Sequence, residues 1–129
     1  IYGIHGLDAL PASLAAVMGV EFKEVEFSYY HSNHEGAIID RLEEARDAGV
    51  DGIIINAGAL THTSLALADC LAWLKIPFVE VHISNTQARP EEIRHNSFLA
   101  PHAEGVISGF GLTGYGLAAK ALLKIIKSR

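Results

Sequence analysis

The sequence is poor in cysteine and begins without a secretory signal pattern. Cys70 is the one cysteine among 129 residues. The chain can therefore form no internal disulfide, and a reducing cytoplasm is the simplest compartment to expect for it. Cys70 falls among leucines of a predicted helix, which favours a packed small hydrophobe over a nucleophile. The start of the sequence shows no charged segment followed by an apolar one, so the sequence does not indicate secretion.

Basic runs and long apolar runs are also missing, and each absence excludes a class of partner. The formal net charge is -5 and no dense Lys/Arg run is present, so the chain lacks the electrostatic footprint of a nucleic-acid-binding protein. Gly, His or charged residues interrupt each apolar run well before the roughly 20 residues that a membrane span needs. We expect neither nucleic acid nor membrane as a partner, and an anionic ligand would have to be bound by local groups.

What is present is enough apolar material for one globular domain over residues 1–129, because 50% of the residues are hydrophobic. Apolar periodicity predicts helices over residues 7–18, 65–74 and 115–127, and a further helix on which Ile38, Ile39, Leu42 and Ala45 share one face. Strands are predicted over 20–30, 52–56, 78–85 and 105–111. The mixed polarity of 20–30 suits an edge strand, Gly49 suits a helix stop, and Thr61 or Thr63 is placed to cap the third helix. The alternation of strands and helices predicts an α/β sandwich with a parallel sheet.

The start of the chain does not fit a complete sheet of this kind. A doubly wound sheet normally begins with a central strand, whereas this chain begins with a glycine-containing loop and no initiating Met. A sheet without its middle strand would expose two long apolar edges. We therefore predict that the first, central strand lies in about 20 further residues upstream, so that the single domain over residues 1–129 is N-terminally incomplete.

Polar residues at alternate positions of the strand 78–85 indicate a functional site. Glu80, His82 and Ser84 point to one side of this strand. An imidazole with a carboxylate beside it suits a general acid and its orienting group, although a His bonded to a backbone carbonyl is the structural alternative. Ser84 could hold a carboxylate or cap a turn. A Ser-His-Glu hydrolase is disfavoured, because Ser84 and His82 share a strand and no sharp strand-to-helix turn surrounds the serine.

Further candidates fall near the carboxyl ends of the strands, where ligands bind in parallel sheets. Asn56 could bind a hydroxyl group or form an Asx turn. Arg89 and Arg94 could bind a carboxylate through their guanidinium groups or remain solvated. His62 could contact a substrate or cap its helix, and Asp69 is either an exposed helix residue or a partner for a cation. Together they indicate a small site for an anionic, oxygen-rich ligand.

Two motifs for other ligands are weak. His31, His34, His95 and His102 show no metal-ligand spacing. Gly109–Gly114 has the spacing G-x-G-x-x-G, but it comes at the last strand and no acidic residue follows on a later strand, so it makes a poor dinucleotide site.

Three ordered motifs resemble type II dehydroquinase, the 3-dehydroquinate dehydratase of the shikimate pathway. They are Ser32-Asn33-His34-Glu35-Gly36, the run from Ile55 to Ser64, and Glu80-Val81-His82-Ile83-Ser84-Asn85 with Arg89 and Arg94. The match covers nearly the whole chain. The resemblance implies a flavodoxin-like three-layer sandwich, a homo-oligomer that is usually a dodecamer built from trimers, no metal, no cofactor, and conversion of 3-dehydroquinate to 3-dehydroshikimate through an enolate.

The resemblance also implies residue roles. Tyr2 matches the base that removes a proton alpha to the ketone, which requires positive charge such as that of Arg89 to ionise the phenol. His82 matches the general acid, and Glu80 orients it. The implied substrate-binding residues are Asn56, His62, Asp69, Ile83, Ser84 and Arg94, with Arg89 in support and Asp69 reaching a neighbouring subunit's site.

The chain departs from the family pattern in three places. The upstream strand, its Asn-Gly-Pro-Asn segment and the lid arginine are absent from this sequence. Pro90 is a one-residue insertion that bears on the register of Arg94, and Gln87 replaces a usual histidine. A flavodoxin-like module that binds a small ligand without catalysis is the alternative that composition alone would permit.

Overall fold

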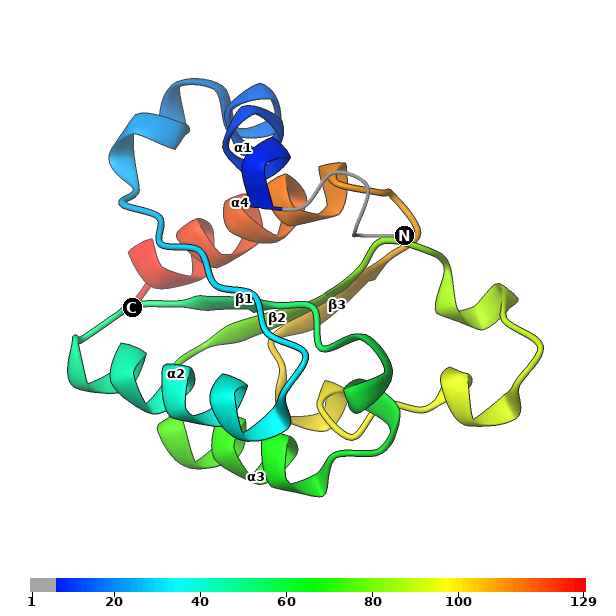
Figure 1. Cartoon of the computed structure of the whole chain (residues 1–129). Helices are drawn as coiled ribbons and strands as arrows, with labels where there is room; N and C mark the ends of the chain where they lie inside the picture. The colour runs from blue at the N-terminus through cyan, green and yellow to red at the C-terminus, as the bar shows by residue number, and fades with distance from the viewer. Residues whose placement is uncertain (1–6) are drawn as a thin grey trace.

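The computed structural model describes residues 7–129 and has three layers (Figure 1). The described residues form one sheet of three parallel strands in the order β1 (Ile53–Ile55), β2 (Phe78–His82) and β3 (Gly105–Ser108). Helices α1 (Leu10–Met18) and α4 (Thr113–Lys127) cover one face of the sheet. Helices α2 (Glu35–Asp47) and α3 (Leu65–Leu74) cover the other face. The predicted α/β sandwich with a parallel sheet is confirmed.

Strand β2 is central because it pairs with β1 on one side and with β3 on the other, and its side chains are buried on both faces of the sheet. Phe78 packs into the cluster formed with α2 and α3, whereas Val79 and Val81 pack against α4. All five residues of β2 are buried, and each large apolar side chain removed from water contributes about 1.5–3 kcal/mol. The alternation that directs Val79 and Val81 towards α4 directs Glu80 and His82 to the opposite face. The polar pair is therefore held by the buried central strand of the sheet.

The prediction of a strand over residues 20–30 is wrong. Gly19–Glu24 forms a 3₁₀ helix (η3), and the following residues pair with no strand among those described. Phe27 and Tyr29 instead pack by their side chains against Leu14 and Met18 of α1. From Val25 to Tyr30 the side chains still alternate between partly buried and exposed. The alternation of polarity is therefore real over this part of the segment, but alternation does not by itself supply a hydrogen-bonded neighbour.

The four predicted helices are confirmed within a few residues of their ends. Gly49 follows α2 at φ 76° and marks its end as expected. The prediction that Thr61 or Thr63 caps α3 is wrong. Ser64 is the N-cap of α3 and accepts a hydrogen bond from the amide of Leu67 at 2.9 Å. No helix within residues 7–129 is both long and apolar enough to cross a membrane.

Candidate active site

Glu80 and His82 form a buried pair at the carboxyl end of β2. Glu80 Oε2 lies 2.6 Å from His82 Nε2, and the two residues are 2% and 6% exposed. A carboxylate can only accept at this contact, so Nε2 carries the proton. A buried carboxylate is costly unless it is paired and hydrogen-bonded. The arrangement is that of an imidazole oriented by a carboxylate, as the sequence predicts.

The second oxygen of Glu80 is satisfied by a residue distant in sequence. The Ser97 hydroxyl donates to Glu80 Oε1 at 2.6 Å. Ser97 lies between the 3₁₀ helices η6 (Glu92–His95) and η7 (Ala100–His102). Each oxygen of the carboxylate therefore accepts a hydrogen bond, and the two bonds together fix the orientation of the group.

His62 lies beside this pair on the 3₁₀ helix η4 (Gly58–His62). Its ring is stacked on the His82 ring with centroids 6.2 Å apart and planes inclined by 15°. His62 Nδ1 donates to the backbone carbonyl of Asn96 at 2.6 Å, since a carbonyl oxygen can only accept. The ring is buried and does not cap α3. Of the two roles expected for His62, the cap is therefore excluded.

Asn56 follows β1 and is held by two hydrogen bonds. Its Oδ1 accepts from the amide of Gly58 at 3.1 Å, which is the Asx turn considered as the structural alternative. Its Nδ2 donates to the hydroxyl of Tyr115 on α4 at 2.9 Å. The register aligns Ile55 with Glu80, so Asn56 leaves the sheet at the same edge as the Glu80–His82 pair.

Ser84 lies in a network that joins the loop after β2 to β3. Arg89 donates to Ser84 Oγ at 3.1 Å, and Ser108 Oγ donates to the Ser84 carbonyl at 3.1 Å. The Thr86 amide donates to Ser108 Oγ at 3.2 Å. The backbone beyond His82 is tied further by the amide of Gly111, which donates to the Ile83 carbonyl at 3.0 Å. A guanidinium group and a hydroxyl thus meet beside the strand end, as an anion site requires.

The remaining predicted site residues lie further out. Arg94 lies in η6 and pairs with Glu91 at 3.3 Å near the surface. Asp69 is exposed on α3 and pairs with no basic side chain among residues 7–129. Tyr2 lies outside the described residues. The structure therefore brings His62, Glu80 and His82 into direct contact and places Asn56 and the bonded pair of Ser84 and Arg89 after the carboxyl ends of β1 and β2. Arg94 and Asp69 lie at the periphery.

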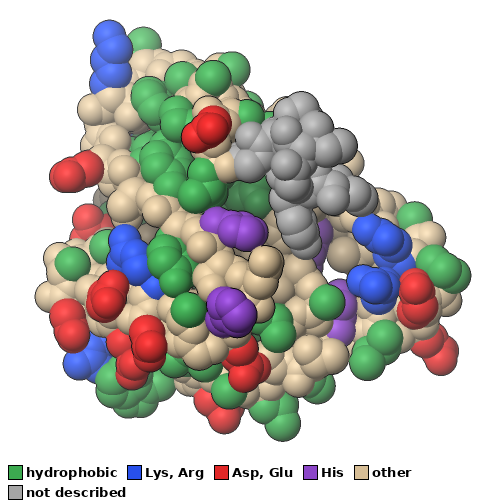
Figure 2. Space-filling model, viewed as in Figure 1, with side chains coloured by type: hydrophobic (Ala, Val, Ile, Leu, Met, Phe, Trp, Pro, Cys, Tyr) green, Lys and Arg blue, Asp and Glu red, His purple; other side chains and the backbone are tan. Residues whose placement is uncertain are grey.

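The surface beside this edge is hollowed. In Figure 2, basic side chains on the segment at the right of the view and histidine side chains on the main body lie on opposite sides of a hollow. Figure 1 shows that this segment, with η5 (Thr86–Ala88) and η6, stands away from the sheet. Cationic and imidazole groups around one hollow suit an anionic ligand.

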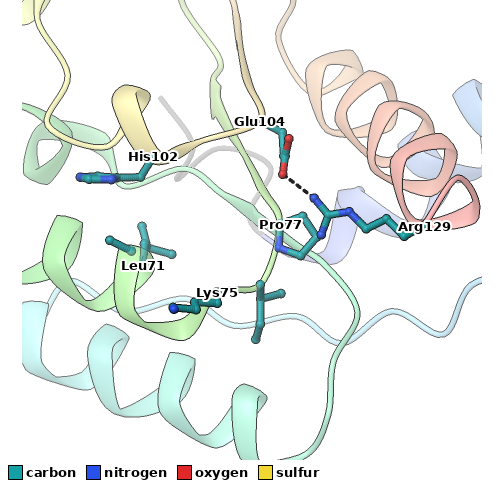
Figure 3. A pocket seen from close by; sticks show the side chains of 8 residues that line it. Leu71, Lys75, Pro77, His102, Glu104 and Arg129 are labelled. Carbon is teal, nitrogen blue, oxygen red and sulfur yellow. Dashed lines mark hydrogen bonds and ion pairs between the residues drawn. The ribbon is translucent and has the colours of Figure 1, made fainter.

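A second hollow of about 240 Å³ lies at the opposite end of β2 (Figure 3). Pro77, which precedes β2, lines it, with Lys75, His102 and the ion pair between Arg129 and Glu104 at 2.8 Å. Ligands in parallel α/β sheets bind at the carboxyl ends of the strands, and this hollow faces the amino ends. It is separate from the site at Glu80 and His82. Among residues 7–129 no three His, Cys, Asp or Glu side chains are grouped so that they could hold a metal ion.

Several residues that position the site are not found from the sequence. Ser97, Ser108, Asn96 and Tyr115 each contact a predicted site residue. The only signal for Ser97 is its place just before a turn that contains Pro101, where a serine often caps. The partners of the other three depend on contacts between segments far apart in sequence.

The fold and the site define an α/β enzyme with a buried carboxylate–imidazole pair at the carboxyl edge of its sheet. The chain belongs to the family described as dehydroquinase class II, whose model matches residues 1–123. It is 47% identical over 129 residues to "Catabolic 3-dehydroquinase" of Sclerotinia sclerotiorum, covering 100% of this chain and 83% of that protein. It is 48% identical over 127 residues to "3-dehydroquinate dehydratase" of Polynucleobacter necessarius subsp. necessarius, covering 98% and 83%. The crystal structure of type II dehydroquinase from Butyrivibrio crossotus is similar with a TM-score of 0.84 and 45% identity, over 95% of this chain and 83% of that one.

Proposed function

We propose that the protein is a 3-dehydroquinate dehydratase that eliminates water from 3-dehydroquinate to give 3-dehydroshikimate, in the shikimate pathway of aromatic amino-acid biosynthesis. The observation that carries the proposal is the buried Glu80–His82 pair at the carboxyl edge of a parallel sheet, in a chain that belongs to the dehydroquinase class II family. Elimination of a hydroxyl group needs a proton donor at the departing oxygen, and an oriented imidazole can supply one.

The reaction proceeds in two proton transfers. Tyr2, as phenolate, removes the proton alpha to the ketone, and the electron pair of the broken C–H bond is held as an enolate. The enolate electron pair then forms the C=C bond as the C–O bond to the leaving hydroxyl breaks. In this step His82 is protonated on both ring nitrogens and gives the proton of Nδ1 to the departing oxygen, so that water leaves. Glu80 holds the imidazole by the bond to its Nε2. Both groups regain their starting protonation by exchange with solvent.

Substrate binding is assigned to the groups around the strand end. Ser84 with the amide of Ile83 would hold the carboxylate, and the bond from Arg89 to Ser84 supports that arrangement. Asn56, His62 and Arg94 would contact hydroxyl groups. Asp69, exposed on α3, would reach the site of a neighbouring subunit.

We propose further that the enzyme works in the cytoplasm as a homo-oligomer, a dodecamer built from trimers. Exposed apolar side chains at the β3 edge support association: Phe110 is 62% and Val106 is 47% exposed. Sedimentation velocity on the complete protein tests the assembly, and a monomer at micromolar concentration would contradict it. The single cysteine supports a reducing compartment.

The activity is tested by mixing the complete protein with 3-dehydroquinate and following the absorbance of the conjugated enone. We expect the absorbance to rise, and His82→Ala to abolish the rise. His102→Ala is the matched control, because His102 is an exposed histidine at the opposite end of the sheet. Binding of 3-dehydroquinate without any absorbance change would support the non-catalytic binding module instead.

A further inference from the structure

Ser97 has three hydrogen bonds, and their directions are fixed. Its oxygen accepts from the amides of Leu99 and Ala100, both at 3.0 Å. Its hydroxyl donates to Glu80 Oε1 at 2.6 Å. Amides can only donate, so the single hydroxyl proton of Ser97 is directed to the carboxylate. A distance of this length is typical of a charge-assisted O–H···O⁻ bond.

The chain on both sides of Ser97 is itself anchored. The amide of Phe98 donates to the Thr61 carbonyl at 2.9 Å, and Leu99 is fully buried in the core cluster between α2, α3 and β2. On the other side, the Asn96 carbonyl accepts from His62. Ser97 is therefore fixed relative to β2 and cannot follow the carboxylate if Glu80 turns.

From this geometry we propose that Ser97 is a positioning residue for the acid–base pair. Two backbone amides direct the Ser97 hydroxyl to one oxygen of Glu80, and this bond presents the other oxygen to His82 Nε2. The inference rests on the proposed function, in which His82 donates a proton to the leaving hydroxyl. Without the Ser97 hydroxyl the carboxylate can rotate about its terminal torsion, and the imidazole loses its fixed orientation.

The chain offers a matched control in Ser64. Ser64 is also a buried serine whose oxygen accepts from a backbone amide, that of Leu67, and whose hydroxyl donates to a glutamate, Glu35. Neither Ser64 nor Glu35 contacts Glu80 or His82 through a hydrogen bond. Ser64→Ala therefore removes the same kinds of bond without touching the acid–base pair.

The kinetic test compares three variants of the complete protein. Ser97→Ala should lower kcat by about 10- to 100-fold, the loss that corresponds to one hydrogen bond to a charged group, with KM changed less than about threefold. Ser97→Thr keeps the hydroxyl and should retain kcat within about threefold of the starting protein. Ser64→Ala should lower the melting temperature as Ser97→Ala does, yet keep kcat within about threefold. Equal kcat values for Ser97→Ala and Ser64→Ala would overturn the proposal.

A second measurement does not depend on turnover. The Nε2–H proton of His82, bonded to Glu80, is followed in ¹H–¹⁵N spectra of the substrate-free protein. We expect its resonance to shift or broaden in Ser97→Ala and to be unchanged in Ser64→Ala. An unchanged resonance in both variants would overturn the positioning role. A starting protein that gives no enone absorbance would overturn the proposed function alone, and the resonance would still decide what Ser97 does.

Discussion

Glu80 and His82 are two residues apart on one buried strand, and their side chains are bonded at 2.6 Å. Because β2 is paired on both sides by β1 and β3, the backbone that carries the two groups is fixed by two ladders. The geometry of the pair is therefore set before any ligand arrives. Enzymes gain most from groups that need no rearrangement when charge develops.

Glu80→Gln keeps the size and shape of the side chain at this position and removes its negative charge. The carboxylate offers an oxygen to each of two donors, His82 Nε2 and Ser97 Oγ, whereas the amide has a single oxygen. One donor then faces an NH₂ group. We expect kcat to fall about 100-fold or more with little change in KM, and stability to fall by about 1–3 kcal/mol. Steady-state kinetics and urea denaturation measure the two effects, and an unchanged kcat would remove Glu80 from the mechanism.

Replacing the two arginines tests the register around Pro90. Arg94→Ala should weaken substrate binding by about 10- to 100-fold, the value of a charged hydrogen bond, and by more than Arg89→Ala does. Arg94 is 36% exposed in its side chain, and its ion pair among residues 7–129 is the surface contact with Glu91, so its loss should leave stability nearly unchanged. Calorimetric titration gives the two affinities. The reverse order would show that the insertion of Pro90 has moved the binding role to Arg89.

Tyr2→Phe tests the base. The substitution removes the phenol and keeps the ring, so turnover should fall by about 100-fold or more while substrate affinity stays close to that of the starting protein. Stopped-flow absorbance measures the first, and equilibrium titration the second. Full activity in this variant would assign the base to another residue.

Gly116 tests the packing of α1 on α4. A Cβ atom at Gly116 would lie 2.4 Å from Val17 Cβ, closer than any real contact. Gly116→Ala should therefore destabilise the protein by about 1–3 kcal/mol. Adding Val17→Ala should restore only a small part of the loss, because it removes the two γ carbons of Val17 but keeps the Cβ atom at 2.4 Å. Gly36→Ala in α2 is the control, because a Cβ there meets nothing within 4 Å. Denaturation midpoints measure all three, and a neutral Gly116→Ala would contradict the close packing of α1 on α4.

Cys70 should be slow to react with alkylating agents. Burial raises the pKa of its thiol, and the negative charge of Glu43 adds to the effect. A raised pKa means less thiolate at a given pH, so alkylation should lag behind that of free cysteine and approach it only at higher pH. Glu43→Gln removes the nearby charge and should speed alkylation. A rate equal to that of free cysteine at pH 8 would contradict the effect of burial.

The sequence predicts what depends on local pattern. Helical periodicity indicated four helices, and an alternating polar row on a buried strand indicated Glu80 and His82. The Asx turn at Asn56 was also expected as one of two roles. These features depend on residues a few positions apart.

Contacts between distant segments are not predictable in the same way. Ser97 lies 17 residues from Glu80, and Tyr115 lies 59 residues from Asn56. The error over residues 20–30 has the same cause, because pairing depends on a neighbouring strand rather than on alternation. Local pattern therefore indicated the groups expected to act on the substrate but not the groups that hold them.

Gly109, in the glycine-spaced run after β3, has a consequence for mutational scanning. It lies at φ 98°, its amide donates to the His82 carbonyl at 3.1 Å, and a Cβ there would lie 3.3 Å from Asn85 Cβ. Any side chain at this position would strain the turn and displace the backbone that carries the imidazole. A mutational screen that scores growth alone would therefore find substitutions of Gly109 as harmful as substitutions of His82. The two could be told apart only by measuring protein abundance alongside activity.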